Sequence, residues 1–271
     1  MVAPFDASEW LWPVFSAPNV RAVMTTRRGG IGAAPFDSLN LRPGIGDDEE
    51  AVAENRRRLA AGLGVPSRRV DQVHGAAVHG FDAESAAADG AADDGLPVAD
   101  ASVTALAGLA CEVQVADCLP VLFADRAGRA VGAAHAGWRG LAAGVLEATL
   151  QRVCDLSGQP PGQIEAWLGA CVGPTQFEVG ADVVAAFGGE APGASAARFA
   201  RRPAASADGA PKWLADLPGL ARDRLAAAGV GRVFGNDGAA AWCTVSNPTR
   251  FFSYRRERHT GRMAALIWRV A

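Results

Sequence analysis

The chain has 271 residues, 49% hydrophobic and 20% charged, with a formal net charge of −3, which fits one large α/β domain with a sizeable core. The charge balance excludes a strongly basic nucleic-acid-binding domain, and the apolar runs fall far short of the roughly 20 residues of a membrane span. Five scattered cysteines without a CxxC pair, and no signal peptide in 1–12, favour a reducing cytoplasm with free thiols.

The predicted elements follow the order of a mixed α/β protein. Short apolar runs bounded by turn residues predict strands, and longer Ala- and Leu-rich stretches predict helices. In chain order we expect a strand at 20–25, a helix at 49–62, strands at 70–73, 76–81, 101–106, 109–116, 119–124 and 130–134, a helix at 141–156, a strand at 164–168, a turn and helix at 177–187, a helix at 213–228, and strands at 230–234 and 263–270.

Two segments lack such patterns. The acidic segment 82–97 is predicted to be a solvated loop, and the low-complexity segment 188–211 a mobile loop. The strands at 70–73 and 76–81 are expected to pair as a hairpin. Because the chain shows no internal repeat and no break in composition, we expect a single domain spanning 1–271.

Reactive side chains lie at predicted strand ends in the middle of the chain. Cys118 lies between two predicted strands, and His135 follows the strand at 130–134 directly before a glycine-bracketed turn. His74 follows an earlier predicted strand in the same way. Two histidines and a cysteine with an open fourth position are typical of a catalytic zinc site. Their long separations leave an alternative open, in which they are ordinary hydrogen-bonded histidines and a packed cysteine.

Several longer motifs occur together in a known family, in the same order. By position they are QVHG at 72–75, ADCLPVLFAD at 116–125, VGAAHAGWRG at 131–140, GACVGP at 169–174, FEVG at 177–180, RFFSYRR at 250–256 and TGRMAALIW at 260–268. With MTTRRGG at 24–30 and the stretch 36–59, the chain resembles the laccase-domain, or YfiH-type, family over nearly its whole length. Members carry names such as polyphenol oxidase, purine nucleoside phosphorylase and peptidoglycan editing factor.

The resemblance implies a fold, a metal and a set of reactions. The fold is a single-domain layered sandwich of mixed β-sheets flanked by helices, a YfiH-like fold of the cysteine-hydrolase type. The metal is one ion, usually zinc, held by the residues that match His74, Cys118 and His135. The reactions are phosphate-dependent cleavage of adenosine, inosine, guanosine and methylthioadenosine, with adenosine deamination in addition. Ala170, where proline is expected, and Phe177, where tyrosine is common, depart from the family pattern.

These reactions need charged groups around the metal. Phosphorolysis needs a cationic cradle, for which Arg139 at a predicted helix N-terminus is the first candidate. Arg27 and Arg255 are further candidates, with a solvated or ion-paired face as the alternative for each. Deamination needs a proton shuttle, and Asp117 and Glu178 are the nearest carboxylates in the motifs. Asp117 is equally suited to orienting a metal-binding histidine.

Other side chains are candidates for contacts with the nucleoside. Asn40 can hydrogen-bond a base or a ribose, or alternatively form an Asx turn in its loop. The aromatic rings of Trp138, Phe251 and Tyr254 can stack on a purine, with core packing as the alternative for Trp138. The first expectation is a cytoplasmic enzyme whose partners are purine nucleosides and phosphate rather than nucleic acid or a membrane. The sequence does not determine the oligomeric state, and we expect a monomer.

Three other functions stay open. Cys118 can be the nucleophile of a cysteine hydrolase, with His135 or His74 as its base, that acts on an amide of a peptidoglycan precursor. A copper-dependent polyphenol oxidase would be a weak activity of Cu2+ in the same site, because four histidines cannot build a multicopper centre. A non-enzymatic metal-binding module would normally use four protein ligands, whereas the motifs supply three.

Overall fold

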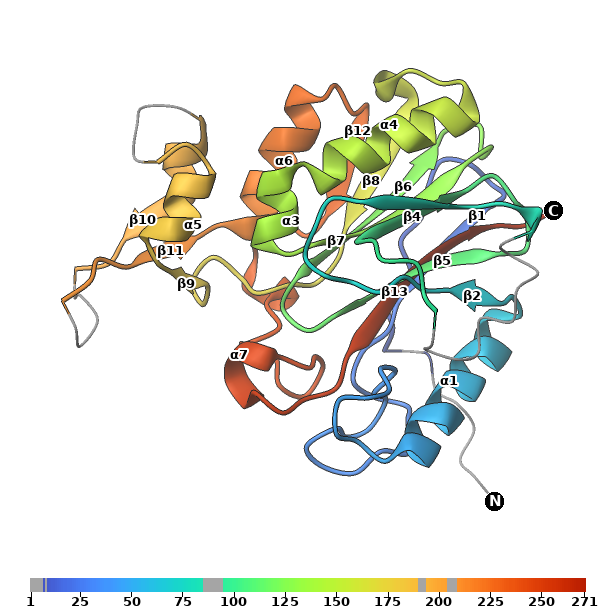
Figure 1. The fold of residues 1–271 in the computed structure, drawn as a ribbon, viewed down its shortest axis with the longest axis horizontal. Helices are drawn as coiled ribbons and strands as arrows, with labels where there is room; N and C mark the ends of the chain where they lie inside the picture. The colour runs from blue at the N-terminus through green and yellow to red at the C-terminus, as the bar shows by residue number, and fades with distance from the viewer. Residues whose placement is uncertain (1–6, 8, 85–94, 190–193, 204–208) are drawn as a thin grey trace.

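The computed structural model describes residues 7, 9–84, 95–189, 194–203 and 209–271. Two mixed β-sheets lie against each other, and helices cover both outer faces (Figure 1). The expected mixed sheets with flanking helices are therefore confirmed. None of the helices in the described ranges is long and apolar enough to cross a membrane.

The six-stranded sheet forms the centre of the molecule. Its strands, in spatial order, are β12 (Arg232–Gly235), β8 (Ile164–Leu168), β6 (Leu119–Asp125), β7 (Val131–Ala136), β4 (Ala101–Thr104) and β3 (Val78–Phe81). The pairs β12–β8 and β4–β3 are parallel, and the others are antiparallel. Every residue of β4, β6, β7 and β8 is buried, since helices cover one face and the second sheet covers the other.

The four-stranded sheet lies on the inner side of helix α1 (Glu49–Leu63). Its strands are β1 (Val20–Met24), β13 (Met263–Arg269), β5 (Ala110–Val115) and β2 (Ser67–Arg68). Val52, Leu59 and Leu63 of the helix are buried, and Leu59 and Leu63 pack in one cluster with residues of this sheet. The Asp48 carboxylate caps the helix by accepting the backbone N–H groups of Glu50 and Ala51.

Helices α3 (Trp138–Ala143), α4 (Val145–Ser157) and α6 (Leu217–Ala227) cover the outer face of the six-stranded sheet (Figure 1). The predicted single helix at 141–156 is wrong in its start and in its continuity. Gly144 has φ 94°, a left-handed conformation that ends α3 and begins α4 in a new direction. The start of α3 directly follows the end of β7.

A small three-stranded sheet lies beside this body (Figure 1). It contains β9 (Glu178–Val179), β11 (Trp213–Ala215) and β10 (Phe199–Arg201), with helix α5 (Ala181–Ala186) following β9. The predicted helix at 213–228 is therefore wrong at its start, because 213–215 pair with both neighbours. The helix begins only after Asp216, whose carboxylate accepts the Gly219 N–H.

The two segments predicted as loops have different outcomes. The prediction of a loop throughout 188–211 is wrong for its described part, which contains a 3-10 turn at 194–198 and strand β10. Residues 190–193 and 204–208 lie outside the described residues, as does 85–94 of the acidic segment. Further short elements are helix α7 (Tyr254–Glu257) and 3-10 turns at 161–163 and 240–242.

The predicted hairpin of 70–73 with 76–81 is also wrong. Residues 70–73 make only an isolated bridge, between Asp71 and Val98, and β3 pairs in parallel with β4. The reason lies in a side chain: the backbone N–H groups of residues 73 to 75 bond to the Asp100 carboxylate instead of a neighbouring strand. The polypeptide before β3 is thus shaped by one buried acid.

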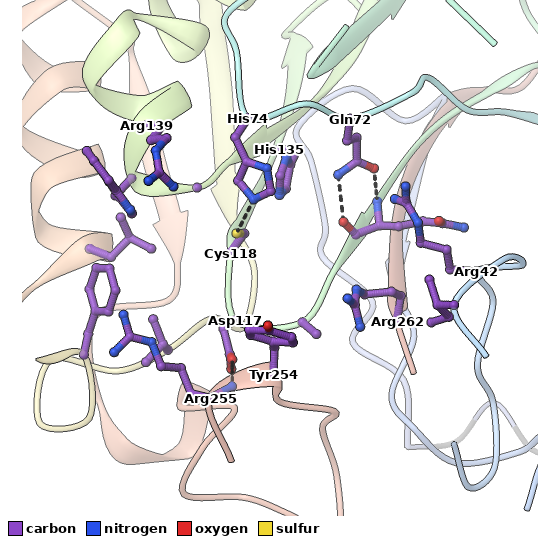
Figure 2. Close-up of a pocket in the computed structure, with 18 residues that line it drawn as sticks. Arg42, Gln72, His74, Asp117, Cys118, His135, Arg139, Tyr254, Arg255 and Arg262 are labelled. Carbon is purple, nitrogen blue, oxygen red and sulfur yellow. Dashed lines mark hydrogen bonds between the residues drawn. The ribbon is translucent and has the colours of Figure 1, made fainter. Parts of the chain in front are cut away.

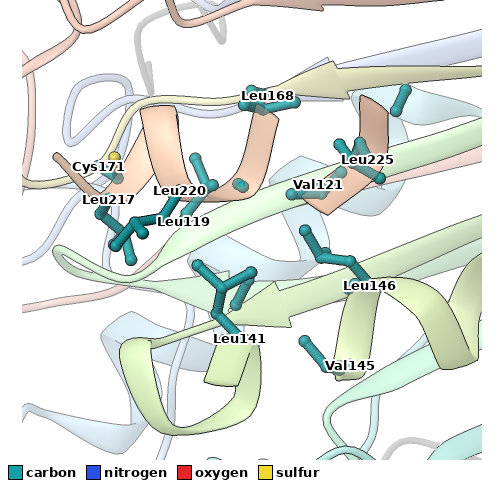
Figure 3. Close-up of a cluster of buried hydrophobic side chains, with 14 of the residues drawn as sticks. Leu119, Val121, Leu141, Val145, Leu146, Leu168, Cys171, Leu217, Leu220 and Leu225 are labelled. Carbon is teal, nitrogen blue, oxygen red and sulfur yellow. The ribbon is translucent and has the colours of Figure 1, made fainter. Parts of the chain in front are cut away.

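Buried leucines anchor the elements that carry the reactive side chains (Figure 3). Leu119 directly follows Cys118, and Leu141 lies in the helix that follows His135; both are fully buried. Burying a leucine side chain contributes roughly 1.5–3 kcal/mol. The strand start and the helix start beside the site are therefore held by the core.

Candidate active site

Three donor side chains meet where β6 and β7 lie side by side. His74 comes from the loop before β3, Cys118 from the turn before β6, and His135 from within β7 (Figure 2). Their donor atoms all lie within 4.8 Å of one another, and Cys118 Sγ is 3.7 Å from His74 Nε2. The structure thus brings together three residues that are far apart in the sequence.

Asp100, buried directly before β4, organises this cluster. Its carboxylate accepts hydrogen bonds from the backbone N–H of His74 at 2.9 Å and of Gly75 at 2.6 Å, and from His135 Nδ1 at 2.8 Å. Burial raises the pKa of Asp100, but the hydrogen bonds from His135 and Gly75 lower it below its ordinary value. Because an ionised carboxylate can only accept, Nδ1 of His135 carries the proton and its Nε2 is left for a ligand.

Two residues of the site have left-handed backbone conformations that non-glycine residues rarely adopt. His74 has φ 64° and Asp117 has φ 87°. Such a conformation costs about 1–3 kcal/mol and persists where the surroundings hold it in place. Asp100 holds His74, and Asp117 is held by Thr244 Oγ1 at 2.5 Å and by the Arg255 N–H at 2.7 Å. The strain is therefore offset by hydrogen bonds that aim both residues.

Cys118 and His135 form a coupled acid–base pair. Burial raises the pKa of the Cys118 thiol, but the charge and hydrogen bond of His135 and the hydrogen bond of His74 lower it to about 6. Burial lowers the pKa of His135, but the charge of Cys118 and the hydrogen bond to Asp100 raise it to about 9. Both shifts favour a thiolate, which is the form that binds metals and attacks electrophiles.

The three donors fit a zinc ion. Zn–S bonds of about 2.3 Å and Zn–N bonds of about 2.0–2.1 Å separate tetrahedral ligands by roughly 3.5 Å, close to the 3.7 Å between Cys118 and His74. Gly137 leaves room beside them, because a Cβ at that position would lie 2.9 Å from the His74 ring and 3.0 Å from the Cys118 sulfur. Within the described ranges this is the one group of three or more such donors.

A cavity of about 430 Å³ opens over the cluster. Four arginines line it: Arg139 and Arg255 lie on one side of Cys118, and Arg42 and Arg262 on the other (Figure 2). Asp117 is the one carboxylate among the described lining residues. The cavity therefore presents an excess of positive charge and is suited to an anionic ligand.

The two arginines on the first side differ in how they are held. The Arg139 guanidinium stacks on the Trp138 ring at 4.4 Å. The Arg255 guanidinium lies 4.9 Å from the Phe177 ring and donates from Nη1 to the Glu178 carbonyl at 2.7 Å. Within the described structure neither arginine pairs with a carboxylate, so both leave N–H groups for a ligand.

Three of the expected binding residues do not line the cavity. Arg27 is buried and forms ion pairs, both at 3.0 Å, with Asp37 and Glu257. The Glu178 carboxylate pairs with Arg202 at 2.5 Å. Asn40 is fully buried, and its side chain bonds to backbone atoms and to Asp47 in an Asx-type arrangement. Their polar groups are already satisfied within the fold.

Of the three aromatic candidates, two line the cavity. Trp138 is half-buried and Tyr254 is 47% exposed, and both border the cavity. Phe251 is fully buried in the core between the sheets. A stacking role therefore fits only Trp138 and Tyr254.

Three polar residues that shape the site, Asp100, Arg42 and Arg262, were not among the candidates predicted from the sequence. Asp100 is a single acidic residue directly before an apolar strand. This position is the one feature of the sequence that could have indicated its role. Arg42 lies two residues after Asn40, and Arg262 directly precedes strand β13. An isolated arginine at either position is normally a surface residue. Their relevance comes from contacts across the fold.

The comparisons with known proteins agree with the motifs. A family model described as multi-copper polyphenol oxidoreductase laccase matches residues 21–270. The chain belongs to this laccase family. A purine nucleoside phosphorylase from Pseudomonas aeruginosa is 47% identical over 260 residues, 96% of this chain and 98% of that protein. The purine nucleoside phosphorylase YfiH of Escherichia coli is 45% identical over 261 residues, 96% of this chain and 97% of that protein.

A solved structure also resembles this member of the laccase family. The Neisseria meningitidis protein NMB0706 has a TM-score of 0.82 and 44% sequence identity, covering 97% of this chain and 100% of that one. Among the described residues, the two histidines outside the donor cluster form no second group of metal donors. His79 packs against Phe81 with ring centroids 4.7 Å apart, and His259 is exposed. Neither histidine belongs to the donor cluster.

Proposed function

We propose that this chain is a zinc-dependent purine nucleoside phosphorylase that acts on adenosine, inosine, guanosine and methylthioadenosine. The observation that carries the proposal is that Arg139 and Arg255 share one cavity with the His–Cys–His cluster. The names of the relatives support the reaction class. Free thiols at all five cysteines suit a cytoplasmic enzyme, which we expect to be a monomer.

His74, Cys118 and His135 would hold the metal, and Asp100 orients the His135 ring. A zinc ion held by these three residues would supply Lewis-acid chemistry and would lower the pKa of bound water toward about 7. The protein supplies the thiolate that this binding needs, through the lowered pKa of Cys118.

Phosphate binding and glycosidic cleavage fall to the arginine side. An oxygen of orthophosphate forms a bond to C1′ of the ribose while the bond from C1′ to the purine nitrogen breaks. The purine takes the electron pair and a proton, and ribose 1-phosphate remains. Arg139 and Arg255 hold the phosphate and offset its charge. Trp138 and Tyr254 offer aromatic faces to the purine.

Asp117 positions Arg255 in this scheme. One carboxylate oxygen accepts from Thr244 and the other from the Arg255 backbone N–H, which ties the arginine to the turn before β6. Adenosine deaminase activity, in which water replaces the 6-amino group as ammonia leaves, is part of the proposal. Because both oxygens of Asp117 are engaged, we expect deamination to be slower than phosphorolysis.

Hypoxanthine release from inosine, with and without phosphate, tests the function alongside a metal count. We expect phosphate-dependent release with about one zinc per chain. Arg139→Gln should raise the KM for phosphate about tenfold or more, since it removes a charge-assisted contact. Arg21→Gln, at an exposed position on β1, is the matched control. Release that is indifferent to phosphate would reject the phosphorylase.

A cysteine hydrolase is the second candidate, and a specific arrangement favours it. Cys118, His135 and Asp100 form a thiolate, imidazole and carboxylate series like that of cysteine hydrolases. An amide bond in a peptidoglycan precursor would be the substrate. A chelator separates the two candidates, because it should abolish phosphorolysis and leave thiol-dependent amide hydrolysis intact.

Two further interpretations of the metal site, a copper oxidase and a structural metal, make different experimental predictions. Cu2+ in the same three-donor site would give weak phenol oxidation, which added zinc should suppress. A purely structural metal would normally have a fourth protein ligand, and the described donors number three. His74→Ala should therefore abolish activity and keep cooperative unfolding, whereas a structural metal would make that variant unfold.

A further inference from the structure

One buried amide holds two arginines of the cavity side by side. The Asn40 Oδ1 atom accepts hydrogen bonds from the backbone N–H of Arg42 at 3.1 Å and of Arg262 at 2.9 Å. These arginines are 220 residues apart, and the same asparagine donates to the Arg42 carbonyl and to Asp47. A side chain with 0% exposure is thus used to bring two cationic residues together.

The two guanidinium groups have capacity for a ligand. Arg262 donates from Nη1 to the Thr260 and Gly261 carbonyls, at 2.8 and 3.2 Å, which leaves its other N–H groups available. In the described part of the chain, neither Arg42 nor Arg262 has a carboxylate within ion-pair distance. Both line the cavity, on the side of Cys118 opposite Arg139 and Arg255 (Figure 2).

Holding these two cations together costs free energy. Burial and the positive charge of Arg42 both lower the pKa of Arg262 below its ordinary value. The negative charges of Cys118 and Asp117 act on the Arg262 pKa in the opposite direction. An anion bound between the two guanidinium groups would reduce their mutual repulsion. Two planar guanidinium groups offer more N–H donors than one carboxylate can accept, so the several oxygens of a phosphate group match them better.

We propose that Arg42 and Arg262 form a second anion subsite, separate from Arg139 and Arg255, which binds a phosphate group. The phosphate is either that of a nucleoside 5′-monophosphate or free orthophosphate. The first source would extend the substrate class from nucleosides to nucleotides, and this part of the inference rests on the proposed function.

Calorimetry on the zinc-loaded enzyme tests the subsite without turnover. An Arg139→Gln/Arg255→Gln background removes the other proposed phosphate contacts. In it, sodium phosphate or inosine 5′-monophosphate should still bind, and adding Arg42→Gln should weaken that binding at least about tenfold. Binding of inosine should not change. Arg42→Lys, which keeps the charge and loses the fork, should give an intermediate result.

The two probes distinguish the sources of the phosphate. Tighter binding of inosine 5′-monophosphate than of inosine, lost with Arg42→Gln, assigns the subsite to a nucleotide. Binding of orthophosphate alone, lost in the same variant, assigns it to the free ion. Equal binding of both probes with and without Arg42 overturns the subsite. These binding measurements do not require turnover, so they remain valid if the enzyme shows no phosphorolysis. The phosphorylase proposal and the subsite proposal can therefore fail independently.

Discussion

Asp100 accepts a hydrogen bond from His135 Nδ1 at 2.8 Å while its carboxylate also binds the backbone N–H groups of residues 73 to 75. One acid therefore sets the ring orientation of one donor histidine and the backbone position of the other. The geometry of the cluster depends on this carboxylate as much as on the donors themselves.

Asp100→Asn should lower zinc affinity about 10- to 100-fold, the usual effect of losing a partner that orients a metal-binding histidine. Competition with a chromophoric chelator measures the change. Asp125→Asn is the matched control, because that buried carboxylate also accepts three backbone N–H groups, in the turn between β6 and β7, and touches no donor residue. Equal zinc affinity in the two variants would contradict the role of Asp100.

Gly137→Ala should weaken metal binding without a backbone penalty. Its φ is −64°, which alanine adopts freely, but the added methyl would press on His74 and Cys118. Zinc content after dialysis, together with the thermal unfolding midpoint, measures both effects. Gly162→Ala, where a Cβ has no heavy atom within 4 Å, is the control. A fully zinc-loaded Gly137→Ala enzyme would show that the site does not need this space.

Zinc should protect Cys118 from alkylation. Its thiol lines the cavity, and its pKa is lowered to about 6, so the metal-free protein should react with iodoacetamide at neutral pH. Peptide mass spectrometry follows the labelling with and without zinc. Cys154 serves as an internal reference, since it lies outside this cavity and burial raises its pKa. Identical labelling of Cys118 in both states would argue against a Cys118–zinc bond.

Stability at acid pH should depend on Glu112, a fully buried carboxylate in β5. Burial raises its pKa, but the charge of Arg56 and the hydrogen bond from Ser67 lower it below 4.5. Because the folded-state pKa is the lower one, Glu112 stabilises the fold above about pH 4.5, and the contribution disappears as pH falls through the folded-state value.

Urea unfolding at about pH 7 and about pH 4 checks this expectation. The free energy of unfolding should fall more between these values in the wild type than in Glu112→Gln, because the variant has no carboxylate to protonate. Glu50→Gln, at an exposed position in the first turn of α1, should behave as the wild type. If the free energy of unfolding fell as much in Glu112→Gln as in the wild type, other groups would be responsible for the acid sensitivity.

Elements with a local apolar pattern could be predicted from the amino-acid sequence. The strand at 164–168 follows from a short apolar run bounded by turn residues, and the helix start at residue 49 follows from the capping chemistry of Asp48. The motif resemblance also pointed to the three donors, because His74, Cys118 and His135 each lie in a recognisable string. These features depend on neighbouring residues, which a sequence displays in full.

Several polar groups of the site, in contrast, depend on contacts between segments that are distant in the chain. Asp100 and Asn40 form hydrogen bonds to segments that are distant in the chain. Arg27 forms ion pairs with Asp37 and Glu257 and does not line the cavity. A polar residue leaves no periodic signal, and its partner depends on which backbone groups the packed sheets bring within about 3 Å. The three donors and the cavity arginines Arg139 and Arg255 were therefore visible in the sequence, whereas Asp100, Arg42 and Arg262 were not.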